Sequence, residues 1–308
     1  MPRLAALSID LDEVPCYCAI HGLADPPEAA RWAVYERAIP RYVSLLDRLG
    51  IRATFFVIGG DLSNPRAAKV AASLCAAGHE LGNHTQDHDY AFSRLGEPAL
   101  SEQIERASAA IEAATGARPS GFRAPGYTIN DAVVAALARS DIAYDSSLFP
   151  CPAYYGAKAA ALAAISLAGR RSHSILDDPR MLTAPADPYR LGTPYYRPGR
   201  GPLELPIGVT RELFGRLPFF GTSLSLGGPA LARRLAHAIA GRPLVNLELH
   251  GLDLCCADQD DLGFLARYQH DLKVPISRRQ AALESAIEAL RARGYQFVRL
   301  VEAAQAFS

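Results

Sequence analysis

Short apolar segments typical of buried strands alternate with amphipathic helical patterns along the chain, and this alternation constrains the fold more than any other feature. The segments predicted as strands are 4–10, 53–58, 80–83, 120–123, 142–145, 203–206, 244–250 and 296–300. Apolar residues recur at helical spacing in 27–49, 65–77, 98–114, 131–140, 229–240 and 278–293. Such an order predicts a mostly parallel sheet, open or closed into a barrel.

One stretch, 150–228, breaks this alternation. It places aromatic pairs such as Tyr154-Tyr155 among prolines, glycines and arginines. We expect a loop-rich insertion that forms a lid or a substrate wall, with a plain surface loop as the alternative. The chain of 308 residues is 49% hydrophobic, which is enough for one large core, so 1–308 is predicted to be a single domain.

Charge and cysteine content exclude several classes of protein. The chain has 32 Lys plus Arg and 32 Asp plus Glu, so no net field favours nucleic acid. The apolar run 4–9 leaves no room for a cleavable signal, and no run approaches the ~20 apolar residues of a membrane span, so we expect a cytoplasmic protein. All six cysteines, Cys75 included, are predicted to be free thiols. A soft-metal position is the alternative for the five that follow predicted strand ends: Cys16, Cys18, Cys151, Cys255 and Cys256.

Two carboxylates end the first predicted strand, in Ser8-Ile-Asp-Leu-Asp12. Because side chains alternate along a strand, Asp10 and Asp12 leave on one face, and Ile9 and Leu11 on the other. Two close carboxylates repel each other unless one binds a cation and the other meets a proton or an arginine. A helix-capping or loop-entry role is the alternative for the isolated pair.

A second cluster, Gly78-His-Glu-Leu-Gly-Asn-His84-Thr-Gln-Asp-His88, follows a predicted strand. His84 and His88 are four residues apart, which places them on one face if the turn is helical. Two imidazoles and a carboxylate, with water in the open position, form a common catalytic zinc shell. Together with Asp12, the pair predicts a divalent metal site, with Zn²⁺ as the favoured ion.

The order of Asp-x-Asp, His-Thr-x-x-His, Arg-x-Pro and a late strand ending in histidine resembles the polysaccharide deacetylase family, carbohydrate esterase family four, over residues 4–300. The resemblance implies a distorted (β/α) barrel and a metal-dependent hydrolase that removes N-acyl groups from sugars. It implies that Asp10 is the general base, that Asp12, His84 and His88 hold the metal, and that Thr85 steadies the loop beside the substrate through its hydroxyl.

The segment Phe122-Arg-Ala-Pro125-Gly-Tyr127 matches the arginine motif of the family. The resemblance implies that Arg123 pairs with the catalytic base, a bidentate task that suits a planar guanidinium; a surface arginine in a turn is the alternative. Gly126 stands where the family usually has an aromatic residue, and Tyr127 follows it. Both are expected at the substrate, with a backbone N–H near Gly126 donating to the oxyanion.

The late strand Leu244-Val-Asn-Leu-Glu-Leu-His250 places Asn246, Glu248 and His250 on one face. By the resemblance, His250 is the general acid that protonates the leaving amine. Glu248 departs from the family, which commonly has an apolar residue there. We expect its carboxylate to bond the substrate or His250, with a structural ion pair as the alternative. Asp145 lies where the family tends to place an acid that orients the histidine; a turn role is the alternative.

These residues predict a metal-dependent carbohydrate de-N-acylase, with N-acetyl as the favoured acyl group, within one catalytic domain. A cytoplasmic location favours an acylated amino sugar that is small, nucleotide-linked or lipid-linked, the last processed at the inner face of the membrane. The alternatives are a deformylase or another linear or cyclic amide hydrolase of the same superfamily, and a non-catalytic carbohydrate-binding protein. The oligomeric state stays open.

Overall fold

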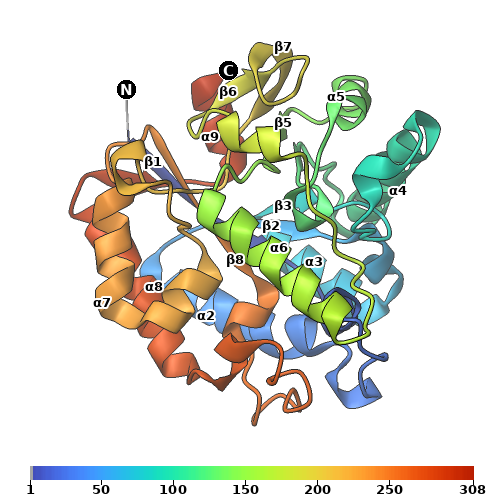
Figure 1. Ribbon diagram of the computed structural model, residues 1–308, viewed down its shortest axis with the longest axis vertical. Helices are drawn as coiled ribbons and strands as arrows, with labels where there is room; N and C mark the ends of the chain where they lie inside the picture. The colour runs from blue at the N-terminus through green and yellow to red at the C-terminus, as the bar shows by residue number, and fades with distance from the viewer. Residues whose placement is uncertain (1–2) are drawn as a thin grey trace.

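A curled sheet of nine strands forms the centre of the computed structural model, which describes residues 3–308 (Figure 1). The strand order is β6-β7-β5-β4-β3-β2-β1-β8, and β9 pairs with the start of β1. Every pairing is parallel except that of β6 with β7. The strands are β1 (Arg3–Asp10), β2 (Thr54–Val57), β3 (Glu80–Asn83), β4 (Gly121–Phe122), β5 (Tyr144–Asp145), β6 (Tyr189–Leu191), β7 (Pro198–Glu204), β8 (Leu244–His250) and β9 (Tyr295–Phe297).

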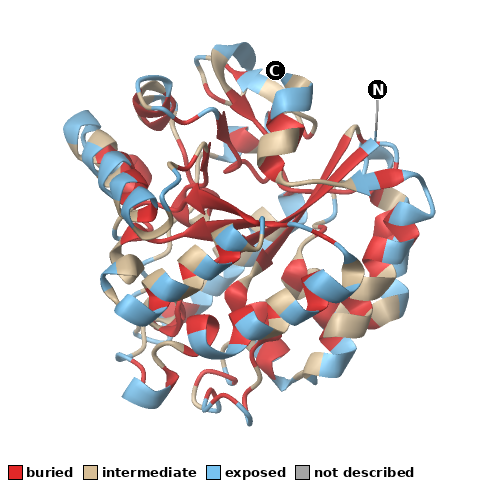
Figure 2. Cartoon of the chain, turned by 180° about the vertical axis from the view of Figure 1, so that it is seen from behind, coloured by how far each residue is buried: buried red, intermediate tan, exposed pale blue. Residues whose placement is uncertain are grey.

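Helices surround this sheet, and their exposed residues lie on the outside of the molecule, while the strands β1 to β5 and β8 are almost entirely buried (Figure 2). They are α1 (Val14–His21), α2 (Ile39–Leu49), α3 (Pro65–Ala76), α4 (Glu97–Thr115), α5 (Asp131–Ala138), α6 (Pro152–Leu167), α7 (Gly221–Ile239), α8 (Ile276–Arg291) and α9 (Leu300–Phe307). Within the described part of the chain, no helix combines the length and the apolarity that a membrane crossing requires. The predicted succession of strands and helices is confirmed.

Strand β1 shows how the alternation in the sequence divides the molecule into two cores. Ile9 and Leu11 belong to the large outer core, which α2, α3, α7 and α8 share. Leu4 and Ala6 face the inside of the curl, where α9 contributes Leu300 to a smaller core. The following inward positions of the strand are polar. The predicted separation of faces is therefore confirmed, and it directs Asp10 into the curl.

An irregular segment, rather than a further strand, bridges the open side of the curl. Leu205 N–H donates to Asp145 O at 2.8 Å, and Gly208 N–H donates to Asn246 O at 2.8 Å. The segment after β7 therefore contacts β5 on one side and β8 on the other. These bonds make the arrangement a distorted barrel, as predicted.

The insertion at 150–228 is more regular than we expected. It contains the sixteen-residue helix α6, which crosses the middle of the view in Figure 1, and the β6–β7 pair. The helix begins with Pro152 after the cap Cys151, and its alanine-rich sequence has a high helix propensity. The aromatic and proline pairs around it obscured this propensity. A smaller error is at the C-terminus, where the predicted strand 296–300 ends at Phe297 and α9 starts at Leu300.

Candidate active site

The predicted site residues lie where β1, β3, β4 and β8 end at their carboxyl edge. In the sheet, Asp10 is directly opposite His250, and Asn83 is opposite Phe122. The residues that follow these strand ends, Asp12, His84 and Arg123, are all buried. The carboxyl edge of a parallel sheet therefore brings together side chains from four distant parts of the sequence.

Asp12, His84 and His88 form a buried group whose ligand atoms point toward one another. Asp12 Oδ1 lies 3.2 Å from the Nε2 atom of each histidine. Neither Asp12 Oδ1 nor the ring nitrogens of His88 have a hydrogen-bond partner of good geometry within the described residues. The Nε2 atoms of both histidines and Asp12 Oδ1 converge on a shared point.

This group fits a divalent cation. Ligand atoms at about 2.1 Å from one ion lie roughly 3 Å apart, as the carboxylate and imidazole atoms here do. His84 Nδ1 donates to Arg123 O at 2.7 Å, which leaves Nε2 free to coordinate. Burial opposes charge at His88, but Asp12 raises its pKa to about 10, so the group attracts positive charge. The three residues converge as a possible metal site, whereas no cysteine joins such a group among the described residues.

The loop that carries both histidines is not helical, contrary to the condition we placed on their spacing. Thr85 and His88 have positive φ angles of 64° and 50°, which fold the loop back on itself. Thr85 Oγ1 accepts a hydrogen bond from His88 N–H at 3.1 Å, and Asn83 Oδ1 accepts one from Thr85 N–H at 2.8 Å. Thr85 is fully buried and its hydroxyl bonds the backbone of the loop, while its place among the substrate-binding residues stays a prediction.

Arg123 is fully buried and pairs with Asp10, but through one hydrogen bond rather than two. Its Nη1 donates to Asp10 Oδ1 at 2.6 Å. The other donors go elsewhere, with Nη2 bonding the hydroxyls of Ser8 and Ser146 at 2.9 and 2.8 Å and Nε bonding Ser146 O at 2.8 Å. The guanidinium also lies 4.2 Å from the ring centre of Phe56. The expected bidentate pair is therefore wrong, and the serines inside the barrel hold the remainder of the guanidinium.

His250 lies between a carboxylate and a phenol. Its Nδ1 is 3.1 Å from Glu248 Oε1, and its Nε2 is 3.2 Å from the hydroxyl of Tyr127. Burial raises the pKa of Glu248, and this carboxylate in turn raises the pKa of His250 against the effect of burial. Asp10, Glu248 and His250 also converge within 4.8 Å of one another. Arg123 already neutralises the charge of Asp10. A proton shared by Glu248 and His250 therefore limits the negative charge of this second group.

Asp145 is not the acid beside His250. Its carboxylate accepts from Ser147 Oγ at 2.5 Å and lies next to Glu204, and it makes no hydrogen bond to His250 within the described chain. Ser147 Oγ in turn accepts from Ala124 N–H at 2.8 Å, directly after Arg123. Asp145 thus supports the arginine loop. Its predicted contact with the histidine is wrong, because Glu248, on the same strand as His250, is the carboxylate beside the imidazole.

A cavity of about 120 Å³ opens between Asp10, Asp12 and His250, and Gly126 and Tyr127 also line it. Sequence reasoning missed further residues of this cavity. An added Cβ at Gly126 would lie 3.2 Å from the Tyr90 ring and 3.6 Å from Lys158 Nζ. Tyr90 and Lys158 therefore occupy the space of the aromatic side chain that the family usually has there. The sequence signalled Tyr90 only by its position after His88; Lys158 stands in no motif. The other lining residues are Ile20, which sequence reasoning missed, and Tyr154 and Ser174, which belong to the insertion that was expected to form a lid or a substrate wall.

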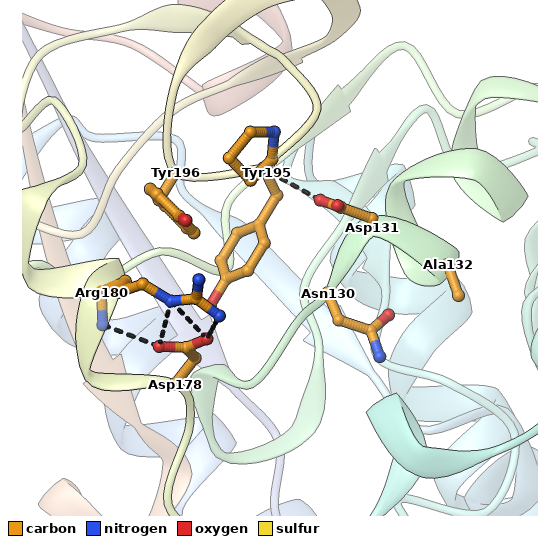
Figure 3. A pocket seen from close by; sticks show the side chains of 8 residues that line it. Asn130, Asp131, Ala132, Asp178, Arg180, Tyr195 and Tyr196 are labelled. Atoms are coloured by element: carbon orange, nitrogen blue, oxygen red, sulfur yellow. Dashed lines mark hydrogen bonds and ion pairs between the residues drawn. The ribbon is translucent and has the colours of Figure 1, made fainter.

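A separate hollow, shown in Figure 3, contains none of these groups. Arg180 points at Asp178 and bonds both of its carboxylate oxygens, and Asp131 accepts from Tyr195 N–H at 2.7 Å. Because these polar groups bond one another, we assign no chemistry to this hollow.

Comparison with known proteins finds a likeness to one family over part of the chain. A family model described as polysaccharide deacetylase matches residues 32–144, which include both histidines of the metal group and Arg123. Over these residues the chain is similar to polysaccharide deacetylases. The peptidoglycan-N-acetylglucosamine deacetylase of Bacillus cereus is 38% identical over 95 residues, which are 30% of this chain and 42% of that protein. The chain spans 29% to 42% of the length of the curated relatives it matches.

Solved structures bear out the fold over nearly the whole chain. A candidate polysaccharide deacetylase from Mycobacterium smegmatis is 20% identical, with a TM-score of 0.60 that covers 99% of this chain and 89% of that one. A CE4 family pseudoenzyme from Bacillus anthracis is 15% identical, with a TM-score of 0.50 over 98% of this chain and 66% of its own. The predicted distorted (β/α) barrel of the polysaccharide deacetylase type is thus confirmed.

Proposed function

We propose that this chain is a divalent-metal-dependent hydrolase of the polysaccharide deacetylase family that removes an N-acyl group, most simply N-acetyl, from an amino sugar. The observation that carries the proposal is the convergence of Asp12, His84 and His88 beside the Asp10–Arg123 pair, with His250 on the neighbouring strand. The named activity of the Bacillus cereus relative supports an acetylated glucosamine unit as the first substrate to test.

The cation would be held by Asp12, His84 and His88. When bound there, such an ion supplies a Lewis acid that polarises the acyl carbonyl and lowers the pKa of a water toward ~7. The tautomer of His84 is already set by its bond to Arg123 O. The favoured ion stays Zn²⁺, since imidazole and carboxylate ligands suit it.

Asp10 is proposed to take the proton of the attacking water. Arg123 bonds Oδ1, whereas the second oxygen, Oδ2, accepts no hydrogen bond from residues 3–308 and lies 3.8 Å from His84 Nε2 at the edge of the metal group. The hydrogen bond from the guanidinium fixes the orientation of the carboxylate. Asp10 therefore has the position of a general base.

His250 is proposed to protonate the departing amine. Glu248 raises the pKa of the imidazole, which keeps it protonated at neutral pH, and Tyr127 bonds the other ring nitrogen. The oxyanion would rest against the backbone N–H of Gly126, because Tyr127 N–H already donates to Ala124 O. The products are a carboxylic acid and a free amino group. Action in the cytoplasm within one catalytic domain remains a prediction from the sequence.

The test is a panel of acylated amino sugars incubated with protein reconstituted with Zn²⁺, in which released acetate, formate and free amine are measured. The panel contains small, nucleotide-linked and lipid-linked sugars. Acetate release that requires the metal supports the proposal, whereas formate release alone favours a deformylase. Sugar binding without release of any acid favours a non-catalytic carbohydrate-binding protein.

Asp10→Asn provides the residue-level test. It should retain metal and lose turnover by about 10²-fold or more, the usual contribution of a general base. Asp258→Asn is the matched control, since Asp258 is exposed. Undiminished hydrolysis by metal-loaded Asp10→Asn would exclude Asp10 as the base.

A further inference from the structure

A groove of about 360 Å³ adjoins the catalytic cavity. It lies between α1, α6 and the start of α7. Its walls are predominantly apolar, and the side chains that form most of them are Tyr17, Ile20, Tyr154, Ala157, Ala161 and Phe220. A concave, largely apolar site of this size is typical of small-molecule binding.

Helix α6 forms one wall of the groove with a single face. Tyr154, Ala157, Lys158 and Ala161 all line it, at spacings of three and four residues. Ala157 and Ala161 are exposed, and their small side chains leave the groove open. On α7, Thr222 lines the groove, and Leu226, one turn later on the same face, is 52% exposed and extends the apolar surface outward.

The groove continues from the proposed reaction centre. His250, Ile20, Tyr154 and Lys158 line both the groove and the cavity that contains Asp10 and Asp12. His250 borders both spaces, and in the proposed function it faces the leaving amine. The part of the substrate that enters the groove is therefore the part attached to the amine.

The charges beside the groove oppose a phosphorylated ligand. Asp253 and Asp271 both line it and are only 4% and 2% exposed. Their carboxylates would repel a phosphate or diphosphate. The ammonium of Lys158 directs one of its three N–H donors to Gly126 O at 3.0 Å, where the groove adjoins the catalytic cavity. A carboxylate can instead accept a hydrogen bond from a neutral hydroxyl.

We propose that this groove binds an uncharged apolar chain on the amine-bearing half of the substrate, so that the substrate is a neutral amphiphile, an N-acylated amino sugar with an alkyl or aryl aglycone. This inference rests on the proposed function for the orientation of the substrate. It narrows the lipid-linked option to sugars whose linkage carries no phosphate.

The experiment compares the methyl and octyl β-glycosides of N-acetylglucosamine with the methyl glycoside of N-octanoylglucosamine, all below micelle-forming concentrations. Binding to metal-free protein is measured by calorimetry, and hydrolysis by Zn²⁺-loaded protein is measured by amine release. Each methylene that leaves water contributes a factor of about four in affinity. The octyl glycoside should therefore bind at least about 10-fold more tightly than the methyl glycoside.

Ala161→Trp should fill the groove and abolish the octyl preference while binding of the methyl glycoside is kept. Ala163→Trp is the matched control, because Ala163 is exposed on the opposite face of α6. Thermal melting of both variants checks that they fold.

Equal binding of methyl and octyl glycosides would overturn the groove assignment, whatever the activity. A preference for the octanoyl amide that Ala161→Trp removes would place the acyl chain there and overturn the assignment to the amine half. Tight octyl binding that Ala161→Trp blocks, with no hydrolysis of any glycoside, would support the groove and refute the proposed function.

Discussion

Replacement of Arg123 by methionine tests the buried polar network at its most connected point. The guanidinium is fully buried and bonds Asp10, Ser8 and Ser146. Methionine keeps much of the side-chain volume but leaves the Asp10 carboxylate buried without its counter-charge. Removing one partner of a buried ion pair costs about 3–5 kcal/mol, far more than the pair contributes when intact.

The size of the thermal shift follows from the length of the chain. Unfolding entropy of about 2.1 cal/mol/K per residue gives roughly 0.65 kcal/mol/K for 308 residues. A loss of 3–5 kcal/mol should therefore lower Tm by about 5–8 °C. Melting is followed by circular dichroism with a chelator present, so that metal affinity does not contribute. Arg106→Met, which removes an exposed arginine paired with Glu102, should change Tm by less than about 1 °C.

The double variant Asp10→Asn, Arg123→Met identifies the cause of the loss. It removes both charges, so its destabilisation should be smaller than the sum of the single variants by about 1–3 kcal/mol. If the losses add, or if Arg123→Met melts within about 2 °C of the wild type, the uncompensated carboxylate is not the main cost. The packing of Arg123 on Phe56 would then explain its burial better.

Three further predictions concern protons and metal. Burial opposes charge on His250, but Glu248 raises its pKa to about 9, so kcat/KM should fall as the pH rises through that value. In Glu248→Gln the same fall should occur at a lower pH. Profiles that coincide for the two proteins would refute the role of Glu248. Burial raises the pKa of Asp145 to about 6 and that of Glu204 further. Carboxyls with a raised pKa stabilise the fold below their unfolded pKa of ~4, and this stabilisation is lost as the pH rises through the pKa of the folded state. Tm should therefore drop above pH ~4, and it should drop less steeply in Glu204→Gln. Equal slopes for the two proteins would show that the Asp145–Glu204 pair does not cause the drop. Thr85→Val should weaken Zn²⁺ binding about 10–100-fold in chelator competition, and unchanged affinity would deny the hydroxyl its role.

Alternating patterns in the sequence were sufficient to predict the sheet and one face of the site. Period-two patterning directs Asp10 and His250 to the inside of the barrel, and their strands turned out to be direct neighbours in register. The separation of Ile9 from Asp10 follows from the same rule, because neighbouring strand positions face opposite sides of the sheet and Ile9 is buried against the outer helices. Features with a short local cause were therefore predictable.

Contacts between distant segments were harder to predict from the sequence. Nothing in the sequence around Asp145 distinguishes a partner of His250 from a partner of Ser147, since both lie within reach of a strand end and only the sheet order separates them. The number of bonds between Arg123 and Asp10 likewise depends on Ser8 and Ser146, which compete for the same guanidinium. Competition among buried acceptors for one donor group is settled by geometry that residue types do not encode.

The alanine-rich helix α6 shows why the substrate side was the hardest part to predict. A catalytic group must be a residue with particular chemistry, so Asp12 or His84 can be recognised by type. A binding wall needs only the right shape, and Ala157 and Ala161 contribute by what they leave empty. Small residues on one helix face are usually core or solvent-facing, and only the position of α6 beside His250 gives them a function. If the groove binds as proposed, the specificity of this chain lies in residues that no motif contains, while its chemistry lies in residues that motifs describe well.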